Sequence, residues 1–231
     1  MAEPPPLWRW ATELGAVPKV LAAPCRRADH CENFGMGRPV LVIPGMLSGD
    51  RSTALLRASL RQAGFDPYGW QEGFNVRVTT QAIARVEGRL ADIATSTGRK
   101  VVIIGWSLGG LYARLLAHRR PELVALVVTL GSPFSGNRRA NNAWRLYERL
   151  NDHTVDAPPF PEEISAKPPV PTIAMWSTKD GIVAAECARG APDESDARFE
   201  LPYRHFELGS SRRAIAVIVG ALHNFMEEER P

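Results

Sequence analysis

The feature that most constrains the fold is an alternation between short apolar runs and segments with helical periodicity, which extends along most of the chain. Most apolar runs have the length and β-branched composition of buried strands, and turn-forming or polar residues follow them. Such alternation is typical of βαβ units. We therefore predict an α/β fold with a mainly parallel sheet of about six strands flanked by helices. The predicted strands are PVLVIPG (39–45), FDPYGW (65–70), KVVIIGW (100–106), LVALVVTLGS (123–132), TIAMWSTKD (172–180) and RFELPY (198–203).

Helices are predicted between these strands. Asp50 and Ser52 are placed to cap a helix that contains LLRASLRQ, and Gly64 follows its end. An amphipathic helix over residues 79–98 ends at Gly98. The other predicted helices are one that begins after Ser107, a closing helix over 208–226 and an N-terminal helix within 1–24.

The length and composition fit one domain over residues 1–231, because 45% hydrophobic residues suffice for a core without disulfides or metal. Residues 134–170 interrupt the alternation. They contain a helix-like piece, NNAWRLYERL, and then a proline-rich passage that fits neither a central strand nor a long helix. Between two parallel strands, this insertion forms either a cap over the site or a surface excursion, and we favour the cap.

The formal net charge is +3, and no tract of basic residues alternates with aromatic residues, which argues against a nucleic-acid partner. The N-terminal residues lack the basic region and the apolar core of a signal peptide. The longest apolar run near the C-terminus, residues 214–222, has about half the length that spans a bilayer. We therefore predict a soluble, cytoplasmic protein with no integral membrane segment.

The chain has three cysteines, Cys25, Cys31 and Cys187, which cannot all pair internally and so favour a reducing compartment. Cys25, His30 and Cys31 lie close together in the sequence and raise the question of a metal site. A structural metal site usually needs four ligands, and no second cluster supplies the remainder. We predict no metal and no cofactor.

The segment VVIIGWSLGG places one serine between two glycines where a buried strand meets a helix. In a tight strand-turn-helix, the residues two positions on either side of the serine must lack a bulky Cβ. Gly105 and Gly109 satisfy this requirement. The turn therefore exposes the hydroxyl of Ser107 above the strand, which makes it a candidate nucleophile.

A serine hydroxyl needs a base to accept its proton, and the base needs an acid to orient it. In this architecture the acid and then a histidine follow the serine, each after a later strand. Asp180 directly follows one predicted strand and His205 follows another. We predict Ser107, Asp180 and His205 as a catalytic triad. The alternatives fit less well: Asp152, Asp156, Asp193 and Asp196 for the acid, and His30, His118, His153 and His223 for the base, with His223 the second choice.

The tetrahedral oxyanion would need two backbone donors. One is the N–H of Leu108 at the start of the helix, where the helix dipole favours a negative charge. The second is expected from the loop PGMLSG, where Met46 is the candidate. Aromatic residues that lie where they could line an acyl pocket are Trp70, Phe74, Trp106, Phe134 and Trp144, although packing roles explain them equally well.

The motifs LVIPGML, GWSLGG, TLGSPFSG, WSTKDGIV and PYRHFELG occur in an order that resembles the α/β-hydrolase superfamily, and specifically its bacterial lipase and esterase branch. The resemblance runs from Pro39 to the closing helix. It implies an α/β-hydrolase fold with a short cap insertion. Two departures are evident: Pro44 and Gly45 stand where many members have His-Gly, and no antiparallel strands precede Pro39.

These observations predict a cofactor-free serine hydrolase that cleaves a carboxylic ester through an acyl-enzyme. The family resemblance implies a hydrophobic acyl group. Two alternatives stay open: a non-catalytic binding protein with the same fold, and an acyltransferase or thioesterase that uses the same triad. The predicted partner is a small-molecule ester, while the acyl-chain length, the leaving group, any mobility of the cap and the oligomeric state are left open.

Overall fold

The computed structural model describes residues 2–14 and 33–228. Within this part of the chain, six strands form one parallel sheet in the order β2-β1-β3-β4-β5-β6. Every predicted strand is present, several of them shorter at their polar ends, so the α/β prediction is confirmed. The strands are β1 (Pro39–Ile43), β2 (Asp66–Gly69), β3 (Val101–Trp106), β4 (Val124–Leu130), β5 (Thr172–Trp176) and β6 (Ala197–Glu200).

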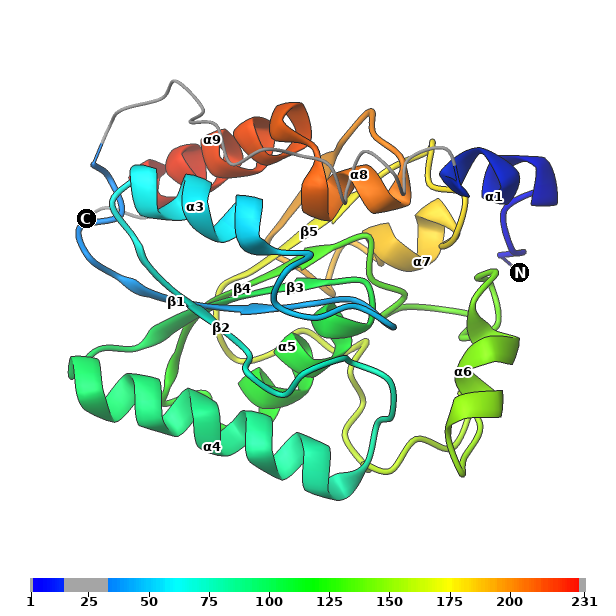
Figure 1. Ribbon diagram of the computed structural model, residues 1–231, viewed down its shortest axis with the longest axis horizontal. Helices are drawn as coiled ribbons and strands as arrows, with labels where there is room; N and C mark the ends of the chain where they lie inside the picture. Colours follow the sequence, from blue (N-terminus) through cyan, green and yellow to red (C-terminus); the bar gives the residue numbers. More distant parts are fainter. Residues whose placement is uncertain (1, 15–32, 229–231) are drawn as a thin grey trace.

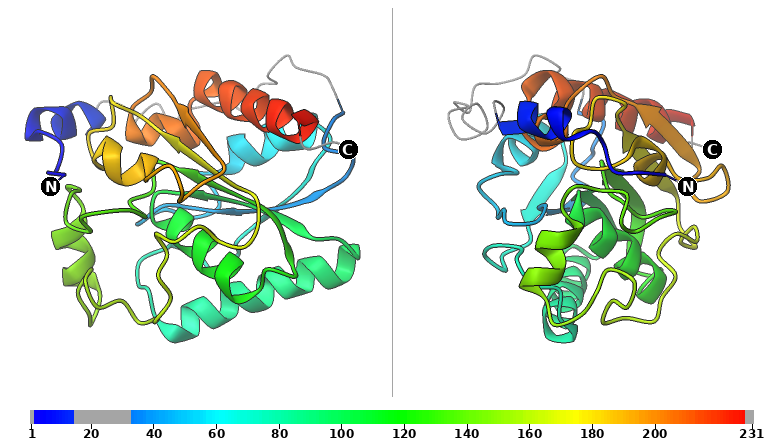
Figure 2. Two further views of the ribbon diagram at one scale, coloured as in Figure 1. Left: turned by 180° about the vertical axis from the view of Figure 1, so that it is seen from behind. Right: turned by 90° about the vertical axis from the view of Figure 1, so that its right-hand side faces the viewer.

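Helices cover both faces of the sheet (Figure 1). One face carries α3 (Ala54–Gln62), α8 (His205–Ser210) and α9 (Arg212–Glu228), and the other carries α4 (Thr80–Thr97) and α5 (Leu108–Arg119). Three shorter helices lie toward the end of the sheet where the parallel strands finish, as Figures 1 and 2 show from different sides. These are α1 (Leu7–Leu14), α6 (Trp144–Leu150) and α7 (Ala185–Arg189).

Side chains of each strand alternate between two hydrophobic layers. On β1, Val40 and Val42 pack in the layer that includes residues of α3 and α9, whereas Leu41 and Ile43 pack in the layer that includes α4 and α5. All four side chains are fully buried. Burial on both faces explains why this strand is a continuous apolar run and does not alternate with polar residues.

The predicted start of α3 was wrong. Thr53 occupies the cap position, and no side chain caps the helix. The Asp50 carboxylate instead accepts hydrogen bonds from the backbone N–H groups of Trp70 and Gln71, both at 3.1 Å, and pairs with Arg57. Asp50 therefore ties the loop after β1 to the end of β2. In contrast, α4 ends as predicted: its C-cap is Gly98, in the left-handed conformation.

The predicted closing helix is two helices, because Ser211 has an extended backbone between α8 and α9. Serine competes for backbone hydrogen bonds and so favours helix ends over helix interiors, and Ser210 donates its hydroxyl to the carbonyl of Phe206. The first of the two helices, α8, begins at His205, three residues before the predicted start at residue 208. The short helix α7 was not predicted. The N-terminal helix is present over 7–14, and residues 2–6 of its predicted range are not helical. Residues 1 and 15–24 of that range, together with Cys25, His30 and Cys31, lie outside the described residues.

Candidate active site

The strand order places the loop after β1 beside the turn after β3. β2 lies on one side of β1 and β3 lies on the other, so the connections from β1 and β3 diverge at their carboxyl ends. Such a switch point is where open α/β sheets bind ligands. A cavity of about 1210 Å³ opens here, and its wall includes Met46, Ser107 and His205.

Ser107 is held in a strained turn between β3 and α5. Its backbone has φ 53° and ψ −119°, a left-handed conformation that costs a serine free energy. The flanking glycines are required by close backbone approach: a Cβ on Gly105 would lie 2.3 Å from the carbonyl oxygen of Gly109, and one on Gly109 would lie 2.3 Å from that of Ile43. The Ser107 side chain is half-buried and lines the cavity.

The two candidate oxyanion donors flank Ser107. Leu108 is the first residue of α5, where a backbone N–H has no partner within the helix. Met46 lies in the turn after β1 and, like Leu108, lines the cavity. Among the described residues, neither N–H is engaged by another protein group. Both donors are therefore available to a bound oxyanion.

Asn75 fixes the loop that carries Met46. Its side-chain amide donates to the carbonyl of Pro44 at 2.8 Å, and its backbone exchanges hydrogen bonds of 2.8 Å with Leu47 and Ser48. The residue is 1% exposed. Sequence reasoning missed Asn75, because nothing local indicates that residue 75 meets residues 44–48.

Asp180 and His205 form a buried pair. Asp180 Oδ2 lies 2.7 Å from His205 Nδ1, and Asp180 Oδ1 accepts hydrogen bonds from the backbone of Ile182 at 2.7 Å and Val183 at 2.8 Å. Both side chains are at most 3% exposed. The pair leaves Nε2 of the imidazole for a proton acceptor role, as a triad histidine requires.

The pKa of His205 is raised above its ordinary value. Burial alone would lower it, but the Asp180 carboxylate, its hydrogen bond to the ring and the nearby charge of Glu13 together raise it. A raised pKa means that the imidazole is a stronger base than a free histidine side chain. The environment of His205 therefore suits proton transfer near neutral pH.

Side chains also hold the backbone of His205. The indole Nε1 of Trp106 donates to its carbonyl at 3.1 Å, and Glu13 accepts from its N–H at 2.9 Å. Ser107 and His205 line one cavity, but within the described residues the Ser107 hydroxyl makes no hydrogen bond. Such contacts are often long in the absence of substrate and tighten when it binds.

Four of the five predicted pocket aromatics line the cavity: Phe74, Trp106, Phe134 and Trp144. Trp70 does not. It is 3% exposed, donates its indole N–H to the carbonyl of Gly73 and packs edge-on against Tyr112. Trp106 has a second role that its position in the elbow did not reveal, which is the bond to the His205 carbonyl.

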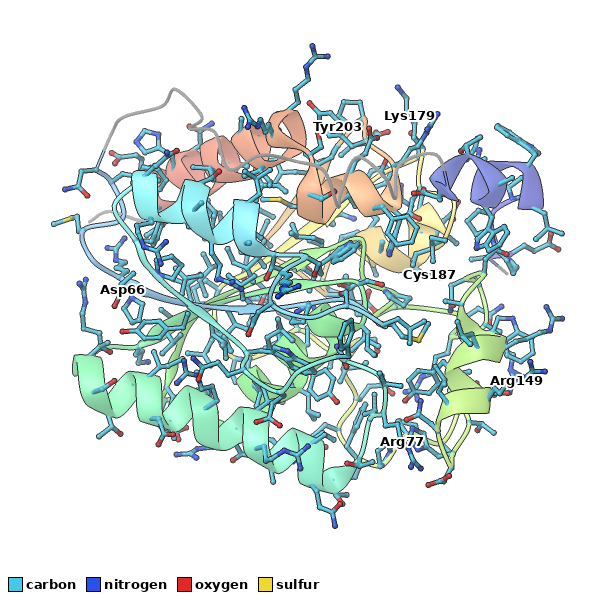
Figure 3. The ribbon with its side chains drawn as sticks, in the orientation of Figure 1. Asp66, Arg77, Arg149, Lys179, Cys187 and Tyr203 are labelled. Carbon is cyan, nitrogen blue, oxygen red and sulfur yellow. The ribbon has the colours of Figure 1, made fainter. Side chains whose placement is uncertain are left out.

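The alternative acids and bases have other partners or lie on the surface. His118 contacts the carbonyl of Ala166, His153 contacts Tyr147, and His223 pairs with Glu227 on α9. Asp152, Asp156 and Asp196 form ion pairs with Arg77, Arg139 and Lys167, and Asp193 is exposed. His30 lies outside the described residues. Figure 3 labels Arg77 and Arg149 on the α6 side of the molecule, away from Lys179, which lies near α1, and from Tyr203, which lies near α8.

Residues 134–170 contribute much of the cavity wall, including Phe134, Trp144, Tyr147, Phe160 and Ile164. Arg114 of α5 ties the end of this segment to the core. Its fully buried guanidinium stacks on the Phe134 ring at 4.1 Å, and burial lowers its pKa to about 10. It donates to the carbonyls of Ile164, Ser165, Ala166 and Glu194.

No three His, Cys, Asp or Glu side chains gather into a metal-binding cluster within residues 2–14 and 33–228. Cys187 is buried and is not in a disulfide, and burial followed by the charge of Glu186 raises the pKa of its thiol. None of the helices in the described ranges combines the length and hydrophobicity that crossing a bilayer requires.

A parallel sheet with a strained serine turn and a later Asp–His pair defines an α/β-hydrolase fold. A family model described as alpha/beta hydrolase fold matches residues 58–161, which include β3 and Ser107. The chain has the α/β-hydrolase fold.

Solved structures with this fold include lipases and esterases. A monoacylglycerol lipase from Paleococcus ferrophilus is 15% identical, with a TM-score of 0.58 over 80% of this chain and 94% of that one. A lipase-esterase related protein from Clostridium acetobutylicum is 15% identical, with a TM-score of 0.61 over 85% and 97%. Naproxen esterase from Bacillus subtilis is 15% identical, with a TM-score of 0.53 over 82% and 84%. At these identities the likeness establishes the fold and not the reaction.

Proposed function

We propose that the protein is a serine hydrolase that cleaves a carboxylic ester with a hydrophobic acyl group. The observation that carries the proposal is the buried Asp180–His205 pair, with its 2.7 Å contact, whose His205 lines the same cavity as the elbow serine. Lipase and esterase neighbours support the same reaction class.

In this mechanism Ser107 Oγ attacks the acyl carbon while His205 Nε2 accepts its proton. Asp180 orients the imidazole and stabilises the imidazolium that forms. The N–H groups of Met46 and Leu108 hold the oxyanion. His205 then gives the proton to the leaving alcohol, which leaves an acyl-enzyme. In the second half of the reaction water attacks the acyl carbon while His205 accepts its proton, and His205 returns that proton to Ser107 Oγ as the acid leaves.

The cavity wall is the basis for the proposed acyl preference. Aromatic and aliphatic residues dominate it, among them Phe134, Leu111, Leu115 and Ile164. Transfer of an apolar acyl chain from water to such a surface is favourable by about 0.8 kcal/mol per buried methylene. Residues 134–170, which supply part of the wall, act as a cap in this proposal.

The test is intact-protein mass after exposure to a fluorophosphonate, on the wild type and on Ser107→Ala. We expect one adduct on the wild type and none on the variant, because only an activated serine attacks this reagent. Ser52→Ala, which removes another cavity serine, is the control and should be labelled like the wild type. A p-nitrophenyl ester series then measures the acyl preference, and release of free acid distinguishes hydrolysis from acyl transfer. Folded wild type without an adduct would contradict the proposal.

A further inference from the structure

We propose that Glu13 of α1 is a positioning residue that holds the loop of Asp180 and the start of α8 in register. The inference rests on the proposed function for what the Asp180–His205 pair does. Glu13 lies on α1, which precedes Pro39, the residue at which the resemblance to the α/β-hydrolases begins.

The Glu13 carboxylate joins the two segments directly. Its Oε1 accepts hydrogen bonds from the backbone N–H groups of Gly181 at 3.0 Å and His205 at 2.9 Å, and its Oε2 accepts one from Phe206 at 3.2 Å. A carboxylate only accepts hydrogen bonds, so three N–H donors satisfy it well. One side chain therefore holds the residue after Asp180 and the residue that bears the imidazole.

The burial pattern of α1 indicates that this contact is the reason for its docking. From Leu7 to Glu13, Glu13 is the one side chain that is buried, at 1% exposure. The apolar Leu7 and Trp8 of the same helix are 74% and 64% exposed. A helix that docked for packing alone would bury its apolar side chains and leave its carboxylate in water.

Further contacts place α1 across the same two segments, and Figures 1 and 2 show the helix at this end of the molecule. Arg9 donates to the carbonyl of Thr178 at 2.7 Å, and Arg204 donates to that of Thr12 at 3.2 Å. The approach is close: a Cβ on Gly181 would lie 2.6 Å from the Arg9 carbonyl oxygen. Both the acid loop and the base helix are thus fastened to α1.

Glu13 also acts on the charge of His205. Two carboxylates face the imidazole, Asp180 from the loop after β5 and Glu13 from α1. The nearby guanidinium groups of Arg9 and Arg204 bind the carbonyls of Thr178 and Thr12. The Glu207 carboxylate of α8 accepts from the Arg204 N–H. The uncharged rings of Trp106 and Phe206 contact the imidazole, and Gly131 also lies close to it.

The experiment compares Glu13→Gln, Glu13→Asp and the control Glu3→Gln, which changes an exposed carboxylate of the same segment. Glutamine keeps the shape of Glu13 but loses the charge and turns an N–H₂ group toward an N–H donor. We expect Glu13→Gln to lower kcat on a p-nitrophenyl ester by about 10-fold to 100-fold, with KM within about twofold. Glu3→Gln should match the wild type.

The pH profile separates positioning from simple stabilisation. Loss of a negative charge beside His205 lowers the pKa of its imidazole, so the acid limb of kcat/KM should move down by about half a unit to one unit in Glu13→Gln. Glu13→Asp keeps the charge with a shorter reach, and its acid limb should stay nearer to that of the wild type while kcat falls. A lower Tm with unchanged kcat and unchanged acid limb in Glu13→Gln would overturn the inference.

Titration of the His205 ring by NMR needs no substrate and so tests the inference separately from the proposed function. A lower imidazole pKa in Glu13→Gln than in the wild type is expected, and equal values would overturn the role of Glu13. Wild type that fails to react with the fluorophosphonate, yet shows this pKa difference, would overturn the proposed hydrolase function and leave the Glu13 contact established.

Discussion

Ser107, Asp180 and His205 each depend on neighbours that fix their backbone. Ser107 has a φ of 53°, and such strain, about 1–3 kcal/mol, persists only where the surroundings impose it. Here β3 and α5 impose it, and Gly105 and Gly109 make the turn possible. Asp180 and His205 are likewise fixed by backbone N–H groups and by Glu13. The residues of the proposed triad are therefore held in place by contacts that are present without substrate.

Replacement of the proposed triad should give losses that do not add. Ser107→Ala and His205→Ala should each reduce kcat/KM by about 10⁴-fold or more, and the double variant should lose little beyond either, because the residues act as one unit. Asp180→Asn should be the mildest of the crippling changes, since the nucleophile stays in place. The measurement is kcat/KM on a p-nitrophenyl ester, and losses that multiply would show that one assignment is wrong.

The residues of the proposed triad are ones that a local sequence pattern marks, and their catalytic role stays a prediction. The elbow serine was marked by its glycines, and Asp180 and His205 were marked by their places after strands. Glu13, Asn75 and the indole N–H of Trp106 gave no such mark, because their partners lie far away in the sequence. Trp70 was wrongly assigned to the pocket wall for the same reason: the loop after β2 turns it toward Tyr112.

At the scale of elements, α5 both begins directly after Ser107, the proposed nucleophile, and anchors the proposed cap. Its first turn offers the Leu108 N–H to the site, and one turn and a half later Arg114 binds the returning end of residues 134–170. A buried arginine that satisfies several backbone carbonyls is costly to remove, because those carbonyls then lose their donors.

We therefore expect Arg114→Met to lower the free energy of unfolding by about 3–5 kcal/mol. It should also increase proteolysis within residues 158–170, because the carbonyls of Ile164, Ser165 and Ala166 lose their partner. Arg61→Met, at an exposed position on α3, is the control and should change stability by less than about 0.5 kcal/mol. Urea unfolding and limited proteolysis measure both effects. An Arg114→Met variant as stable as the wild type would show that the cap segment is held in another way.

Elements were predictable where periodicity decides them, as in the strands and in α4 and α5. Their ends were less predictable, because tertiary contacts set them. Asp50 does not cap α3, because its carboxylate binds the backbone of Trp70 and Gln71. Ser211 separates the predicted closing helix into α8, which begins with His205, and α9, which packs along the sheet. The role of the insertion as a cap stays a prediction.

At the scale of the whole molecule, the proposed site is assembled from segments spread over the entire described chain. The loop after β1, the elbow after β3, the insertion after β4, the acid loop after β5 and the helix after β6 all meet at the carboxyl end of the sheet. Parallel strands produce this convergence, because every strand delivers its following loop to the same edge. Helix α1 then reaches the same edge from the N-terminal side, and no rule of the parallel sheet predicts it.

The raised pKa of His205 makes activity and stability respond to pH in opposite directions. Catalysis needs the neutral imidazole, so kcat/KM should fall as the pH drops through a value above about 6.5, the ordinary histidine pKa. For stability, the folded state binds the proton more tightly than the unfolded state. The contribution of His205 is therefore fully present below the unfolded pKa and is lost as the pH rises through the folded pKa.

The difference in unfolding free energy between the wild type and His205→Gln isolates this contribution. We expect the stability of the wild type relative to the variant to decrease as the pH rises from about 6 to a value above the folded pKa of His205. Above that value the difference should no longer depend on pH. Urea denaturation over a pH series measures it, and Glu3→Gln should show no such slope relative to the wild type. A difference that grows with pH would mean that the folded protein holds His205 neutral. In that case burial, and not the Asp180 and Glu13 carboxylates, would dominate the environment of the base.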